Sequence, residues 1–132
     1  MASKVASDRL ASRPGTGRHA EELAAAFLEQ AGLRVVARNW RRPEAELDIV
    51  ADDGGTCVFV EVRSRTGEAQ GHPLESITPH KQAKVIRAAR LYLAAESPSA
   101  SGFRFDVVAV TFDPSGSEEP VLIHIPNAFE VP

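Results

Sequence analysis

Apolar residues recur with helical spacing in two segments of the chain. From Arg18 to Ala31 they fall on one face of a helix, and Gly32 follows where a left-handed C-terminal cap is favoured. A second helix is predicted from Pro79 to Ala95, because Thr78 and Pro79 form a capping residue and a first helical position. We therefore expect two amphipathic helices with a longer, differently patterned segment between them.

Strand-like patterns occupy most of the remaining chain. Alternation in the second of the expected strands places Leu47 and Ile49 on one face and Asp48 on the other. The run CVFVEV is almost wholly apolar, so it is typical of a central strand buried on both faces. The five expected strands are Leu33–Arg38, Ala45–Ala51, Cys57–Val62, Phe103–Phe112 and Val121–Ile125.

Turn signals separate these elements. The polar segment Trp40–Glu44 is interpreted as a turn, and Asp52–Gly55 (DDGG) predicts a hairpin. Residues Arg63–Thr78 are expected to form a long irregular connection. The resulting order is α-β-β-β-α-β-β, which predicts an α/β fold with a mixed central β-sheet flanked by helices.

Composition limits the class of protein. The 132 residues, 43% of them hydrophobic and 25% charged, predict one globular domain over residues 16–132, preceded by a disordered tail over residues 1–15. Cys57 is the only cysteine, which excludes an internal disulfide, and no apolar run is long enough to span a membrane. With no apolar secretory signal either, we expect a cytoplasmic protein. The net charge of −3 disfavours a simple polycationic nucleic-acid coat, so any nucleic-acid contact must use local basic clusters.

Two carboxylates interrupt apolar strands near their ends. Asp48 follows Leu47, and Glu61 lies between Val60 and Val62, where an unpaired buried charge is costly. Converging carboxylates repel unless a cation or a proton lies between them, and oxygen-rich sites with vacant positions suit Mg²⁺ or Mn²⁺. The alternative is that the two acids simply form ion pairs with nearby arginines.

Several strings of the sequence give these acids a context. GRHAEELAAAFLEQAGLRVVARNW, AELDIVADDG, VFVEVRSR, HKQAKVIRAARLYL, FRFDVVAV and HIPNAF occur in this order over most of the chain. Together they closely resemble the bacterial YraN-like family of uncharacterised proteins. The resemblance implies a restriction-endonuclease-like core of the PD-(D/E)XK nuclease superfamily, with a divalent metal as cofactor and DNA as substrate.

The same resemblance implies roles for individual residues. The catalytic set would be Glu21, Asp48, Glu61, Arg63 and Gln82, with the metal held by Asp48, Glu61 and the carbonyl of Val62. Arg63 stands where the superfamily usually has lysine, and arginine stays protonated, so it can stabilise charge but is a poor base. This substitution bears on turnover more than on phosphate binding.

Basic residues flank the proposed acidic site and could contact backbone phosphates, although such clusters also occur as ordinary solvated surface. The candidates are Arg38, Arg41, Arg42, Arg65, Lys81, Lys84 and Arg87. Three hypotheses follow: a Mg²⁺- or Mn²⁺-dependent endonuclease acting on branched or single-stranded DNA, a catalytically weak or inactive nucleic-acid-binding module, and an interaction domain. A homodimer that addresses two strands is compatible with the first.

Overall fold

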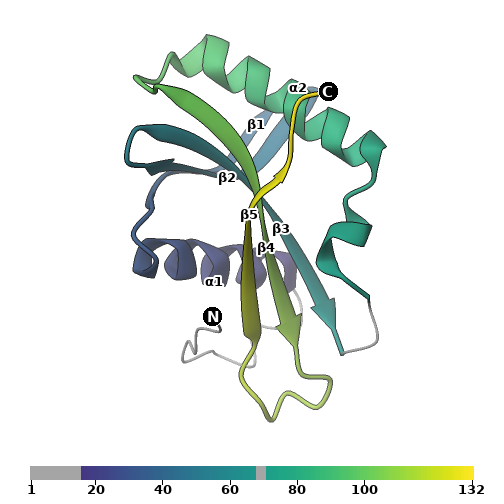
Figure 1. The fold of residues 1–132 in the computed structure, drawn as a ribbon. Coiled ribbons are helices and arrows are strands. Elements are labelled where there is room, and N and C mark those ends of the chain that lie inside the picture. Colours follow the sequence, from purple (N-terminus) through teal and green to yellow (C-terminus); the bar gives the residue numbers. More distant parts are fainter. Residues whose placement is uncertain (1–15, 68–70) are drawn as a thin grey trace.

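A five-stranded sheet in the order β1-β2-β3-β4-β5 separates two helices in the computed structural model, which describes residues 16–67 and 71–132 (Figure 1). The predicted tail over residues 1–15 lies outside the described residues. The elements are α1 (Thr16–Gln30), β1 (Arg34–Arg42), β2 (Ala45–Asp53), β3 (Thr56–Thr66), the short 3₁₀ helix η1 (Pro73–Ser76), α2 (Pro79–Glu96), β4 (Gly102–Phe112) and β5 (Val121–Phe129). The predicted α/β class and element order are confirmed.

The sheet is mixed because one of its connections carries a helix. Strands β3 and β4 are parallel, and α2 forms the crossover between them, whereas the other neighbours are antiparallel. Helix α1 covers one face with a core around Leu28 and Ile49, and α2 covers the other with a core around Phe59 and Tyr92 (Figure 1). Central β3 therefore has both faces buried from Cys57 to Val60, as its apolar sequence predicts.

Local sequence signals mark the start of α2 and the end of α1. Thr78 Oγ1 accepts a hydrogen bond from the Lys81 N–H at 3.2 Å, and Gly32 follows α1 with a φ of 99°. Both features match the predicted caps. Neither helix within the described residues has the length and apolar character needed to cross a bilayer.

Strand β1 is longer than predicted. The segment interpreted as a turn, Trp40–Glu44, continues β1 through Arg42, and the turn consists of Pro43 and Glu44 alone. Trp40 pairs with Leu47 across the β1–β2 hairpin. A charged, polar run is compatible with a turn and also with an edge strand, and β1 is an edge of this sheet.

Strands β3 and β5 also exceed their predicted ends. The polar residues Arg63–Thr66, expected to be irregular, pair with β4 as far as Phe112, so the neighbouring strand holds them in the sheet. Strand β5 continues past Ile125 to Phe129, with a register irregularity opposite Asp106. The connection between β3 and α2 is therefore shorter than predicted and contains η1.

Candidate active site

The paired strands β2 and β3 separate at the position of Asp48. Their backbone pairing begins at Ile49 with Val60, so Asp48 has no partner residue on β3. Instead, Asp48 Oδ2 accepts a hydrogen bond from the Val62 N–H at 2.9 Å. The side chain thus takes the place of a backbone acceptor in the β2–β3 pairing, and this hydrogen bond fixes the Asp48 carboxylate beside the end of β3.

Strict alternation fails at the same point of β2. Leu47 was expected on the face of Ile49, but it packs in the α2-side core, whereas Ile49 packs in the α1-side core. On the adjoining strand β1, Asn39 lies at the level of Asp48 and has a left-handed φ of 52°. The chain therefore changes direction locally where the acid is placed.

Three carboxylates meet at this break in the sheet. Burial, with the charge of Asp48, raises the pKa of Glu61 to about 8, although Arg63 lowers it. Burial raises the pKa of Asp48 as well, despite the hydrogen bond from Val62. On α1, burial and the charge of Asp48 raise the pKa of Glu21, whereas Asn39 lowers it. The acids predicted from the sequence are thus brought together from α1, β2 and β3.

Arginine neutralises this cluster only in part. Arg63 Nη1 lies 3.7 Å from Glu61 Oε2, and Arg63 Nε donates to Ser76 Oγ at 3.1 Å. Asp48 has no ion pair with an arginine or a lysine within residues 16–67 and 71–132. The alternative of simple arginine pairing therefore accounts for Glu61 but not for Asp48.

Asp48 and Glu61 open into a groove of about 330 Å³ between α2 and the ends of β2 and β3. Four acidic and four basic side chains contribute to its walls, so their formal charges cancel. The lining residues are Glu44, Ala45, Glu46, Asp48, Glu61, Arg63, Lys81, Lys84, Val85 and Arg87. The basic residues of the groove are concentrated on α2, and the raised pKa of Glu61 reduces the negative charge opposed to them at neutral pH.

The predicted basic residues fall into separate places. Lys81, Lys84 and Arg87 line the groove, and Arg87 forms an ion pair with Glu44 at the β1–β2 turn. Arg38 lies on edge strand β1.

Three other arginines lie beside the groove rather than in it. On β1, Arg41 is 3.9 Å from Glu46, and Arg42 stacks over the Trp40 ring at 4.3 Å. Arg65 lines a second, smaller pocket on the other side of Arg63.

Gln82 does not join the carboxylates in this structure. Its Nε2 donates to the Ile77 carbonyl at 3.0 Å, and its side chain lines a separate hollow with Arg90. Gln82 therefore helps to fix the start of α2.

The donor set suits a hard divalent cation that keeps part of its hydration shell. In the described part of the chain, no three His, Cys, Asp or Glu side chains are placed to hold a metal ion as they stand. Asp48 and Glu61 nevertheless supply two oxygen ligands whose mutual repulsion a cation would relieve. Mg²⁺ is commonly held by one or two carboxylates with water completing its coordination, so the residues fit such an ion.

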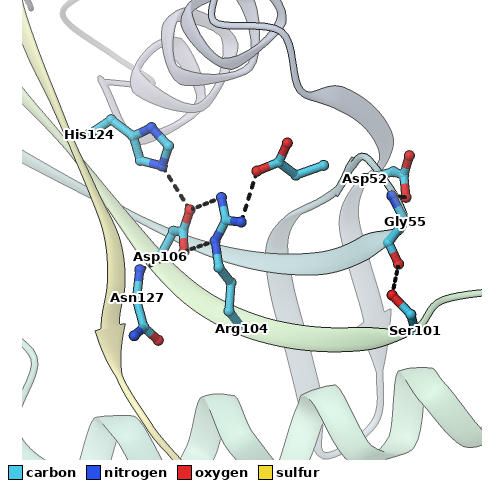
Figure 2. A network of polar contacts seen from close by, with 8 residues as sticks. Asp52, Gly55, Ser101, Arg104, Asp106, His124 and Asn127 are labelled. Carbon is cyan, nitrogen blue, oxygen red and sulfur yellow. Dashed lines mark hydrogen bonds and ion pairs between the residues drawn. The ribbon is translucent and has the colours of Figure 1, made fainter.

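A third strand carboxylate, Asp106 on β4, was not singled out from the sequence. It is fully buried and accepts hydrogen bonds from Arg104 Nε at 3.0 Å, from the Asn127 N–H at 2.9 Å and shares one with His124 Nε2 at 2.7 Å (Figure 2). Arg104 also binds Asp53 at 2.8 Å. Asp106 interrupts an apolar strand just as Asp48 does, so the same signal could have found it.

Two supporting residues of the site were also missed. Asn39 lowers the pKa of the Glu21 carboxyl, and Ser76 Oγ accepts a hydrogen bond from Arg63 Nε. Asparagine before a tryptophan on a charged strand carries no specific signal, and Ser76 is brought to Arg63 only by the turn of η1.

The family model and the curated relatives point to one family. The model of the uncharacterised protein family UPF0102 matches residues 20–110. A UPF0102 protein of Nocardia farcinica is 42% identical over 129 residues, covering 98% of this chain and 100% of that protein. One from Anaeromyxobacter dehalogenans is 46% identical over 118 residues, covering 89% and 86%. A solved structure of Pyrococcus furiosus SfsA in complex with Ca²⁺ aligns at a TM-score of 0.33 and 17% identity, covering 87% of this chain and 64% of that chain, a likeness too low to support any argument.

Proposed function

This chain belongs to the uncharacterised protein family UPF0102, and from the geometry of its groove we propose that it is a Mg²⁺- or Mn²⁺-dependent endonuclease that hydrolyses phosphodiester bonds of branched or single-stranded DNA. The observation that carries the proposal is the pair of Asp48 and Glu61 at the break between β2 and β3, with Glu21 coupled to Asp48. The pair opens into a groove that Arg63, Lys81, Lys84 and Arg87 also line.

The carboxylates are suited to holding the metal. Asp48 is oriented by the Val62 N–H, and Glu61 faces it from the next strand, so both would be direct ligands, with Glu21 acting through water. The carbonyl of Val62 would complete the protein ligands. The chemistry supplied by a divalent ion is Lewis-acid activation of the phosphodiester and of the attacking water.

The basic residues have a different task. Arg63, fixed by Ser76, is placed to stabilise the charge that develops on the phosphate, but its guanidinium does not accept a proton at neutral pH. Lys81 and Lys84 on α2 line the same groove and would contact the flanking phosphates. A proton acceptor for the attacking water is then best sought among the carboxylates, whose pKa values are raised.

The test is cleavage of end-labelled branched, single-stranded and duplex DNA with Mg²⁺ or Mn²⁺. We expect metal-dependent cleavage that falls at least about 100-fold in Asp48→Asn and Glu61→Gln, as typical for loss of an essential charge-stabilising group. Arg34→Gln is the control, because Arg34 is exposed and pairs with Asp52 away from the groove. Full activity in Asp48→Asn would overturn the assignment of the site.

A second candidate is a nucleic-acid-binding module without turnover. It is favoured by Arg63, which occupies the position of an expected lysine and is already engaged by Glu61 and Ser76. This candidate predicts salt-dependent DNA binding with no cleavage of any of the three substrates in either metal. Such a result would refute the endonuclease and leave the binding module.

A further inference from the structure

A small pocket lies against the far side of Arg63 from the groove. Its volume is about 180 Å³, below the range of roughly 300–1,000 Å³ typical of sites for drug-sized ligands. Its polar lining consists of Arg63, Ser64, Arg65, His72 and Ser76, and no carboxylate of the described residues lines it. Size and charge both favour a small anion rather than a whole nucleotide.

Arg65 gives this pocket a fixed positive charge. Its Nε donates to Thr111 Oγ1 at 3.1 Å, and its Nη1 donates to the Gly71 carbonyl at 2.5 Å. Both acceptors are neutral, and within the described residues no carboxylate forms an ion pair with Arg65. The two bonds use two of the five guanidinium N–H groups, so three donors remain for a ligand, and no carboxylate among the described residues neutralises this oriented cation.

His72 adds one further donor to those of the two guanidinium groups that line the pocket. His72 Nδ1 accepts from the Leu74 N–H at 3.2 Å, which places the proton of a neutral imidazole on Nε2. Ser76 donates to the Pro73 carbonyl at 2.8 Å and receives the Arg63 Nε bond, so the wall shared with the groove is held in place. The lining therefore favours an acceptor-rich ligand.

We propose that this pocket is a phosphate subsite, in which Arg65 with Arg63 and His72 binds a phosphate group of the nucleic acid next to the phosphate in the groove. The proposal rests on the proposed function for the identity of its ligand, but the anion site itself does not require cleavage. The phosphate could be an internal diester or a terminal monoester, which share the same oxygen acceptors. Arg63 would then contact both positions, because it lines both the groove and the pocket.

The first experiment uses inorganic phosphate as the probe in metal-free buffer, with amide chemical shifts as the readout. We expect saturable shifts at Arg65, Gly71 and Thr111 that weaken at least about tenfold in affinity in Arg65→Gln. Arg34→Gln is the matched control, since it removes an equal charge from β1 and should bind as the wild type does. Equal weakening in both variants, or none in Arg65→Gln, would overturn the subsite.

Arg65→Lys guards against a folding defect, because it keeps the charge and removes the planar fork. We expect it to fold as the wild type by circular dichroism and to bind phosphate with an affinity between those of wild type and Arg65→Gln. Wild-type affinity in Arg65→Lys together with Arg65→Gln would refute a role for this side chain.

The second experiment identifies the source of the phosphate. Single-stranded oligonucleotides with and without a terminal phosphate are titrated in metal-free buffer. A terminal ligand predicts at least about tenfold tighter binding of the phosphorylated strand, lost in Arg65→Gln. An internal diester predicts equal binding of both strands, with both weakened in the variant. No effect of Arg65→Gln on either strand would overturn the proposal.

The outcomes separate this inference from the endonuclease itself. Phosphate binding that depends on Arg65, without cleavage under any metal condition, would refute the proposed activity and leave the subsite. Metal-dependent cleavage with unchanged phosphate binding in Arg65→Gln would refute the subsite and leave the proposed activity.

Discussion

Carboxylates lie within strands of this sheet in two groups, Asp106 alone on β4 and the pair of Asp48 and Glu61 on β2 and β3. The surroundings of the two groups differ. Asp106 on β4 is fully buried, which by itself raises its pKa, yet bonds from His124, Arg104 and the Asn127 N–H lower the pKa below its ordinary value. At the break between β2 and β3, burial is not offset in this way, and the pKa of Glu61 rises to about 8. Carboxylates that interrupt apolar strands in the same way thus have pKa values shifted in opposite directions.

The difference shows how a structural acid is distinguished from a candidate functional one. Burial of a charge is common to both groups, so burial alone decides nothing. The two groups differ in compensation: Asp106 has donors for both oxygens, whereas Asp48 and Glu61, on neighbouring strands that line the groove, repel each other. The uncompensated group has free energy to gain from a cation or a proton.

The largest expected effect separates the two groups by stability. Asp106→Asn places amide hydrogens against Arg104 and His124, so we expect the free energy of unfolding to fall by about 3–5 kcal/mol. Asp48→Asn keeps an oxygen for the Val62 N–H and removes repulsion, so it should change stability by less than about 1 kcal/mol. Urea unfolding at pH 7 measures both. Equal losses in the two variants would remove the distinction.

The pH dependence of stability should run in opposite directions for the two groups. Because the folded pKa of Glu61 is raised, the folded state retains a proton that the unfolded state releases above about pH 4.5. Stability therefore falls between about pH 4.5 and 8, by about 4 kcal/mol. The lowered pKa of Asp106 contributes stability above about pH 3.8 that is lost in more acidic solution.

Unfolding of wild type and Glu61→Gln across this range tests the first of these slopes. Glu61→Gln should abolish most of the decline between pH 4.5 and 8. A decline of unchanged size in the variant would assign it to another group.

Divalent cations should act on one group alone. Mg²⁺ or Mn²⁺ at about 100 times its dissociation constant should stabilise the folded protein by about 2.7 kcal/mol at pH 8, through binding that the unfolded chain lacks. Glu61→Gln should lose most of this gain, whereas His124→Gln, which alters only the Asp106 network, should keep it. Thermal unfolding with and without the ion measures the gain. Stabilisation that survives in Glu61→Gln would locate the ion elsewhere.

The smallest expected effect concerns Arg63. Its ion pair with Glu61 lowers the pKa of that acid and weakens the contrast between the two groups. Arg63→Lys restores the residue that the family resemblance implies, and we expect the cleavage rate to rise about tenfold, equivalent to about 1.4 kcal/mol in the barrier. Single-turnover cleavage measures it. An unchanged or lower rate would show that Arg63 does not limit the chemistry.

Elements with a strong local signal could be predicted, whereas those held by neighbours could not. Thr78 and Pro79 mark the start of α2 with only short-range interactions, and the apolar run of β3 requires burial in any compact fold. The polar end of β3, up to Thr66, is a strand only because β4 pairs with it. The same holds for Arg42, which the β1–β2 hairpin keeps in the sheet.

The sequence by itself determined that carboxylates interrupt apolar strands, because residue type and strand alternation are local properties. Only the tertiary structure decided which of them are compensated. The hydrogen-bond donors to Asp106 come from its own strand and from β5. At the end of the β2–β3 pairing, no comparable set of described donors surrounds Asp48 and Glu61. Hydrogen bonding and repulsion depend on distances of a few ångströms, and residues far apart in the chain reach those distances only when the sheet has formed.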